Sequence, residues 1–231
     1  MRNNIEKWQV VLEKASVEGV AEFINKVRSN AKVPENAESL LCEARAALMF
    51  REHGFSVRMQ DSPDLKLEYH GVTFFAEVKQ FRLKSQDMVD ETRLLDTGSR
   101  VLEKDLSVLV SYGDTQATEE KHAWQQLVDV ARSKINQYRI NFPNLLVVFS
   151  SSSHCVEDAD FITAVRAINN DISFRKTPGL EKLSGFLFVT KWINVHSSRQ
   201  VYFAPLHNSV IPLPRKLWDA LSKIRYCRWD P

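Results

Sequence analysis

The sequence lacks the features that mark several protein classes. Its three cysteines, Cys42, Cys155 and Cys227, show no Cys-x-x-Cys spacing, which argues against a zinc site or a framework of disulfides. No run approaches the roughly 18 apolar residues of a membrane span, and the first residues contain no apolar signal segment. We therefore expect a reduced, cytoplasmic protein with no membrane partner.

The sequence also lacks a global excess of charge of one sign. Its formal net charge is +2, whereas a tight non-specific nucleic-acid binder is usually strongly basic. An enzyme whose acidic centre is offset by local basic patches remains compatible with this balance. The six histidines do not cluster. His154 and Cys155 are adjacent in sequence, so their side chains would not normally face each other as a nucleophile and its base.

The hydrophobic pattern predicts an α/β fold with a central mixed β-sheet flanked by helices. Predicted helices cover 5–13, 17–28, 36–53, 119–140, 161–168 and 215–225, and predicted strands cover 55–59, 64–69, 72–79, 145–149, 185–189 and 200–203. Residues 1–35 are interpreted as an N-terminal helical appendage to a domain spanning 36–231. The segment 82–117 has no clean periodicity, and its length is typical of a functional or linker insertion.

Acidic and basic residues meet on one predicted hairpin. Asp64 opens its first strand, twelve residues follow, and Glu77 and Lys79 end its second strand beyond a turn at 70–71. Because strand side chains alternate, Glu77 and Lys79 share one face while Val78 takes the other. Carboxylates from neighbouring strands can converge on a divalent cation, and a nearby lysine can hold a phosphate or a water. The pattern therefore indicates metal-assisted phosphodiester hydrolysis.

At these residues the chain resembles the PD-(D/E)XK nuclease superfamily, and the resemblance extends over about residues 38–150. It implies a restriction-endonuclease-like core and a Mg²⁺ or Mn²⁺ cofactor. Hard oxygen ligands suit these ions, and the resemblance implies Asp64, Glu77 and the carbonyl of Val78 as the ligands. Lys79 would then orient the attacking water or neutralise the developing charge.

Glu43 is the predicted third acid of this site, as a metal ligand that binds the ion through water or supports a second metal. It lies in the helix before Gly54-Phe55, and Holliday-junction resolvases of the superfamily have a similar helix glutamate ahead of a Gly-Phe turn. Glu38 is the rival, since an acid in the first helical turn is also favoured by the helix dipole. A solvated surface charge is the plain alternative for Glu43.

Basic and amide side chains near the site are predicted to contact nucleic acid. Lys134 and Gln137 fall on the long predicted helix 119–140, and related nucleases often place a lysine or glutamine on the equivalent helix. Arg82 and Lys84 directly follow the catalytic strand and could line a channel for phosphates. For each of these residues a purely structural role is the alternative.

The sequence thus predicts a metal-dependent nuclease that hydrolyses phosphodiester bonds in nucleic acid, with DNA favoured over RNA. Such enzymes serve in restriction, phage defence, recombination or repair. A homodimer is compatible with this function because duplex cleavage needs two sites or two events. The first alternative is a catalytically silent nucleic-acid-binding or protein-interaction module on the same fold. The second is a non-enzymatic α/β protein in which the motif is accidental.

Overall fold

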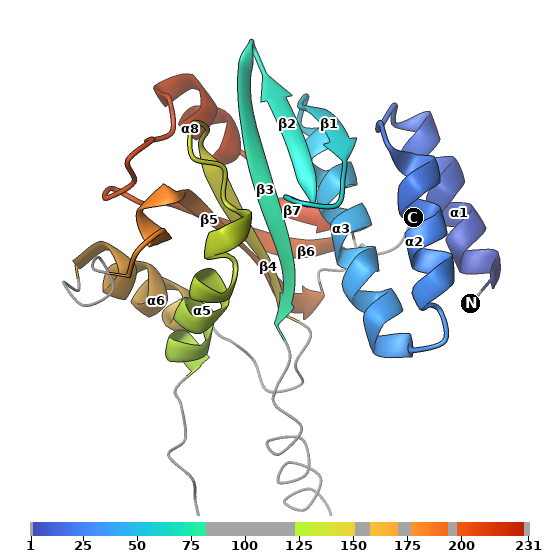
Figure 1. The fold of residues 1–231 in the computed structure, drawn as a ribbon, viewed down its shortest axis with the longest axis horizontal. Coiled ribbons are helices and arrows are strands. Elements are labelled where there is room, and N and C mark those ends of the chain that lie inside the picture. The colour runs from blue at the N-terminus through green and yellow to red at the C-terminus, as the bar shows by residue number, and fades with distance from the viewer. Residues whose placement is uncertain (1, 82–122, 151–157, 171–176, 194–197, 229–231) are drawn as a thin grey trace, which may run out of the picture. The chain divides into compact units, whose positions relative to one another are not determined.

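A seven-stranded mixed sheet forms the centre of the computed structural model, which describes residues 2–81, 123–150, 158–170, 177–193 and 198–228 (Figure 1). The strands lie in chain order across the sheet: β1 (Ser56–Met59), β2 (Leu65–Tyr69), β3 (Val72–Phe81), β4 (Asn144–Ser150), β5 (Leu183–Ile193), β6 (Ser198–Pro205) and β7 (Tyr226–Arg228). Strands β3, β4 and β5 run parallel to one another, and the other neighbours are antiparallel. The predicted α/β class with a mixed sheet is confirmed.

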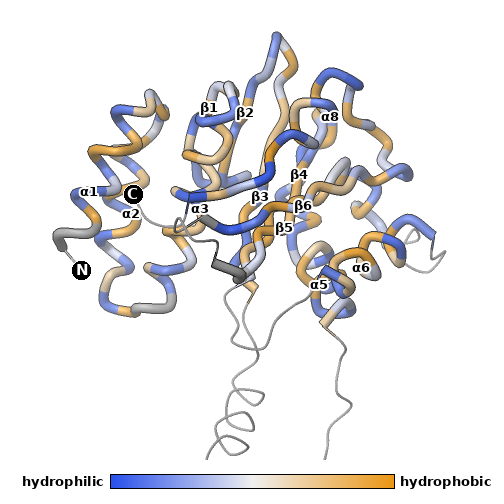
Figure 2. The backbone as a smooth tube through the Cα atoms, turned by 180° about the vertical axis from the view of Figure 1, so that it is seen from behind, coloured by the Kyte–Doolittle hydropathy of each residue, from blue (hydrophilic) through white to orange (hydrophobic). Residues whose placement is uncertain are grey.

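Helices cover both faces of this sheet because its central strands are apolar on both sides. Leu145 and Val147 of β4 join one hydrophobic cluster, whereas Leu146 and Val148 join the other, as period-two alternation requires. The first cluster contains the apolar faces of α1 (Arg2–Lys14), α2 (Val20–Asn30), α3 (Pro34–Glu52) and α8 (Arg215–Leu221). The second contains those of α5 (Ala123–Ser133) and α6 (Asp158–Asn170), next to the 3₁₀ turn η3 (Leu180–Lys182). Figure 2 shows the hydrophobic colour along the central strands.

The two N-terminal helices pack into the same cluster as α3. The turn between them is bonded to β1, since Glu18 accepts the Met59 amide hydrogen at 2.9 Å and donates its own to the Val57 carbonyl at 3.0 Å. Gly19 follows with φ 78, a left-handed conformation that favours glycine. The boundary expected at residue 35 stays a prediction. Among the described residues, no helix is both long and apolar enough to cross a membrane.

Two predicted helices are shorter than expected. The helix predicted over 119–140 ends at Ser133, and the 3₁₀ turn η2 (Ile135–Gln137) follows. The chain turns there because tertiary bonds replace helical ones: the Tyr138 hydroxyl donates to the Ala131 carbonyl at 3.0 Å. The helix predicted over 215–225 ends at Leu221, and β7 follows. Three residues are too few for a periodic strand signal.

Candidate active site

Asp64 lies where β2 stops covering the edge of β3. The pairing of the two strands ends at Leu65 and Ala76, which leaves the next amide groups of β3 without a strand neighbour on that side. Asp64 fills this position: its Oδ2 accepts the Val78 amide hydrogen at 2.7 Å. The Asp64 side chain is therefore buried and oriented by the backbone of the strand that carries Glu77.

Glu77 is the most deeply buried acid of the site, at 1% exposure. Ala76 and Val78 enter the cluster beneath α3, so Glu77 projects from the opposite face of β3, as predicted from its alternation. Its Oε1 forms an ion pair with Lys134 Nζ at 2.7 Å, and its Oε2 accepts the Asp64 amide hydrogen at 3.4 Å. The predicted hairpin thus brings Asp64 and Glu77 together.

Glu43 of α3 is the third acid close to this pair. Its side chain is buried, and its Oε2 lies 3.4 Å from Lys26 Nζ of α2. Its charge adds to the effect of burial on the pKa of Asp64, and the charge of Glu77 adds to the effect of burial on the pKa of Glu43 itself. The rival Glu38 is engaged elsewhere, in an ion pair with Arg45 at 2.8 Å. The geometry therefore favours Glu43 over Glu38 as the helix acid.

Burial, and to a lesser extent repulsion between the acids, raises the pKa values of two of these carboxyl groups. Burial first, then the charges of Glu43 and Glu77, raise the pKa of Asp64 to about 8 against the opposing Val78 amide and Lys134. Burial also raises the pKa of Glu43 to about 7, although Lys26 opposes the shift. At neutral pH the site therefore holds more carboxylate groups than its surroundings can keep ionised, which favours the binding of an additional cation.

Lys79 lies on β3 two residues beyond Glu77, on the same face by alternation, and is half-buried. Lys134 reaches Glu77 from the turn after α5, and Gln137 lies at the end of the 3₁₀ turn η2, so neither is on the helix on which it was predicted. Gln137 Oε1 is buried without a hydrogen-bond partner in the described part of the chain. A buried acceptor in this state is costly, and a bound cation or donor would satisfy it. Arg82 and Lys84 lie outside the described residues.

Two polar side chains next to the acids escaped the sequence analysis. Lys26 reaches Glu43 from α2, but in the sequence it is one of many lysines on a polar helix face. The backbone amide of Gln60 donates its hydrogen to the Asp64 carbonyl at 3.0 Å. The side-chain Nε2 of Gln60 is buried without a partner among the described residues. No motif marks either residue: Lys26 reaches Glu43 only through the packing of α2 on α3, and Gln60 meets Asp64 through a local turn after β1.

Within the described ranges, no group of three or more His, Cys, Asp or Glu side chains is arranged so that it could hold a metal ion. Mg²⁺ typically takes only one or two carboxylates and completes its shell with waters and substrate phosphates. Asp64 and Glu77, which are linked through the Asp64 amide at 3.4 Å, fit that partial shell.

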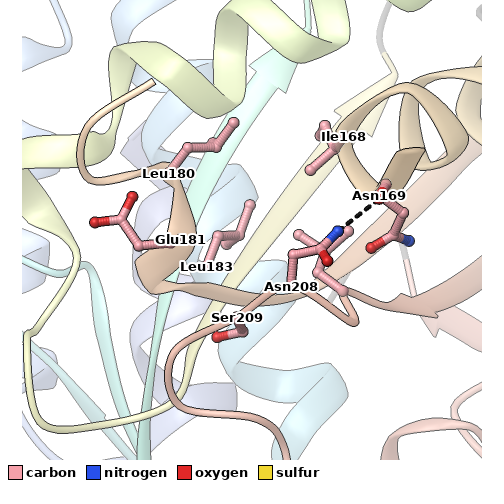
Figure 3. Close-up of a pocket in the computed structure, with 8 residues that line it drawn as sticks. Ile168, Asn169, Leu180, Glu181, Leu183, Asn208 and Ser209 are labelled. Atoms are coloured by element: carbon pink, nitrogen blue, oxygen red, sulfur yellow. Dashed lines mark hydrogen bonds between the residues drawn. The ribbon is translucent and has the colours of Figure 1, made fainter. Parts of the chain in front are cut away.

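A cavity of about 200 Å³ is lined by none of the three acids (Figure 3). It is walled by Ile168 and Asn169 of α6, Leu180 and Glu181 of η3, and Asn208 after β6. Its polar groups are mostly satisfied: Asn208 Nδ2 donates to the Asn169 carbonyl at 2.6 Å, and Glu181 accepts the amide hydrogen of Gly179 at 2.8 Å. This cavity therefore offers few unsatisfied polar groups to a ligand.

No protein-family model, curated protein or solved structure matches this chain.

Proposed function

We propose that this protein is a Mg²⁺-dependent nuclease that hydrolyses phosphodiester bonds, most readily in DNA, on a restriction-endonuclease-like core. One observation carries the proposal: three buried acids lie close together, with the Asp64 amide 3.4 Å from Glu77 Oε2 and Glu43 near enough for its charge to add to the effect of burial on the pKa of Asp64. Lysines lie on either side of them. Burying like charges together is costly for stability, so such a cluster is typical of functional sites.

Asp64 and Glu77 would hold the metal, with Glu43 as a further or water-mediated ligand and the Val78 carbonyl nearby. When bound, the metal would supply polarisation of the scissile phosphate and a lowered pKa for a coordinated water. Lys79 would neutralise the negative charge that develops on the phosphate oxygens. Lys134, which compensates the charge of Glu77 in the metal-free protein, would then be available for a substrate phosphate.

The proposal is tested by cleavage of single-stranded, supercoiled and linear DNA with Mg²⁺ or Mn²⁺. Glu77→Gln and Lys79→Met should each lower the rate at least about 100-fold, as expected for loss of one transition-state contact. Matched controls come from the exposed face of β2, where Glu68→Gln and Lys66→Met delete one negative and one positive charge from solvent-exposed side chains. Both controls should cleave at the wild-type rate.

The same assay separates the alternatives. If all variants cut equally, the activity does not arise at these acids and the site assignment is wrong. If no metal and no substrate gives cutting while DNA still binds, the protein is a silent binding module. Isothermal titration with Mg²⁺ gives an independent readout, because Asp64→Asn should weaken metal binding even where no cleavage can be followed.

A further inference from the structure

A turn beside the acids presents apolar side chains to solvent. Residues 139–142 connect η2 to β4, and all four are exposed. Ile140 is 69% exposed, the highest value among the exposed large hydrophobic residues that the structure describes, and Phe142 is 39% exposed. A single exposed apolar side chain is ordinary, whereas two in a four-residue turn next to a functional site call for a physical reason.

This turn is held in place by Asn144, whose side chain is buried at 1% exposure. Its Oδ1 accepts the Arg139 amide hydrogen at 2.8 Å, and its Nδ2 donates to the carbonyls of Arg139 and Phe142, both at 2.8 Å. Nδ2 also lies 3.0 Å from the Lys182 carbonyl. The backbone that carries Ile140 and Phe142 is therefore fixed from within, and their exposure is not the result of fraying.

The turn is connected to the acidic site on two sides. The Phe142 ring packs edge-on against Phe75 with 5.2 Å between centroids. Phe75 precedes Glu77 by two residues of β3, which places it on the same face about 7 Å along the strand. The Arg139 guanidinium lies 5.7 Å from the Phe75 ring, and its Nη2 donates to the Ser62 carbonyl at 2.7 Å, two residues before Asp64.

The exposed ring of Phe142 and the guanidinium of Arg139, which both pack against Phe75, suit one kind of ligand. Proteins hold unpaired bases by stacking them on aromatic rings and arginine planes, and arginine also pairs with phosphate. Two apolar side chains are too few for a stable protein–protein interface, which buries about 800 Å² on each partner. A base within a duplex is stacked on its neighbours, so it could not use the ring.

We propose that Arg139, Ile140 and Phe142 form a subsite that stacks an unpaired base of the substrate strand next to the phosphate cut at Glu77. The substrate is accordingly nucleic acid with unpaired bases, either single-stranded or with splayed ends. This inference rests on the proposed function, and it assigns to that function a substrate class which neither the acids nor the lysines specify.

The test measures binding of a fluorescent single-stranded oligonucleotide and of the matching duplex to the full chain. All proteins carry Glu77→Gln, so that no substrate is cut during the titration. Phe142→Leu keeps an apolar side chain but removes the ring, and should weaken single-strand binding about 5- to 150-fold. Phe142→Tyr keeps the ring and should bind as the parent does. Tyr226, 52% exposed on β7, provides the matched control as Tyr226→Leu.

Each outcome decides the question. Tight single-strand binding that falls with Phe142→Leu, and not with Phe142→Tyr or Tyr226→Leu, supports the subsite. Equal binding by all variants, or a preference for the duplex, overturns it, while Glu77-dependent cleavage would leave the proposed function standing. Sedimentation tests whether a second protein molecule covers the turn instead. If Phe142→Leu converts an oligomer into a monomer without changing oligonucleotide binding, the turn is a protein interface and the inference fails.

Discussion

The Lys134–Glu77 ion pair offers the sharpest test of the site's electrostatics. The Glu77 side chain is fully enclosed, that of Lys134 is 17% exposed, and the two charges are 2.7 Å apart. Lys134→Met removes the ammonium but keeps a chain of similar length, so little packing is lost. The buried carboxylate would then retain only the long contact with the Asp64 amide, at 3.4 Å, among the described residues.

Breaking one partner of a buried pair costs about 3–5 kcal/mol, because the remaining charge stays desolvated. For a domain of this size, that loss corresponds to a fall in melting temperature of about 6–20 °C. The free energy of unfolding is measured by urea denaturation at pH 7 in the presence of a chelator. Glu77→Gln removes the stranded charge, so the double variant should recover most of the loss. The coupling energy of the cycle should then be about 2 kcal/mol or more.

Two results bear on the reasoning behind this prediction. Lys66→Met, at an exposed position of β2, should change stability by no more than about 0.5 kcal/mol. A loss below about 1 kcal/mol for Lys134→Met would refute the argument, because it would show that solvent screens the Glu77 carboxylate. In the metal-binding proposal, Mg²⁺ should stabilise Lys134→Met more than wild type, since the ion takes over the role of the ammonium.

Three further predictions concern pH, backbone and thiols. Burial and neighbouring acids raise the pKa of Asp64 from 3.8 to about 8, so the folded state binds more protons than the unfolded chain. The stability of the metal-free protein should therefore fall as the pH rises from about 4 to about 8, and it should fall less steeply in Asp64→Asn. A urea midpoint that rises with pH over this window would contradict the prediction. Gly19→Ala should cost about 2 kcal/mol or more, measured by thermal unfolding, because φ is 78 and a β-carbon would collide with a backbone carbonyl of β1. Burial raises the pKa of both Cys42 and Cys227 to about 12, so in a Cys155→Ser variant neither thiol should react with Ellman's reagent at pH 8 until urea unfolds the chain.

The hairpin and its charges were predictable because the relevant information is local. A left-handed turn at His70 and Gly71, with φ of 48 and 79, joins two alternating strands, and alternation alone separates Glu77 from its core-facing neighbours. The buried strand β4 was also predictable, because it is a continuous apolar run in the sequence. These elements contain the site's main acids, so the sequence was sufficient to place them on one hairpin.

The rest depends on packing that no local pattern encodes. From the sequence, Glu43 and Glu38 are both plausible as the helix acid of the site. Only their ion-pair partners distinguish them: Glu43 pairs with Lys26 of α2 and Glu38 pairs with Arg45. The end of α5 is set by tertiary bonds, not by propensity, since Tyr138 donates its hydroxyl proton back to the helix. Such tertiary effects routinely override intrinsic preference at helix ends.

The energetic balance of the acids bears on the choice between an enzyme and a silent scaffold. Asp64 supports the fold by accepting the Val78 amide hydrogen at the open edge of β3, and a neutral asparagine oxygen could accept the same bond. The charge itself brings no such benefit, because burial first, and then the charges of Glu43 and Glu77, oppose its ionisation. Replacing buried ionic groups by neutral ones often stabilises a protein. A scaffold selected only for stability or for binding would gain from neutral side chains here, whereas the proposed site for a divalent cation would require the charges. The proposed metal-dependent function would therefore account for this energetic cost.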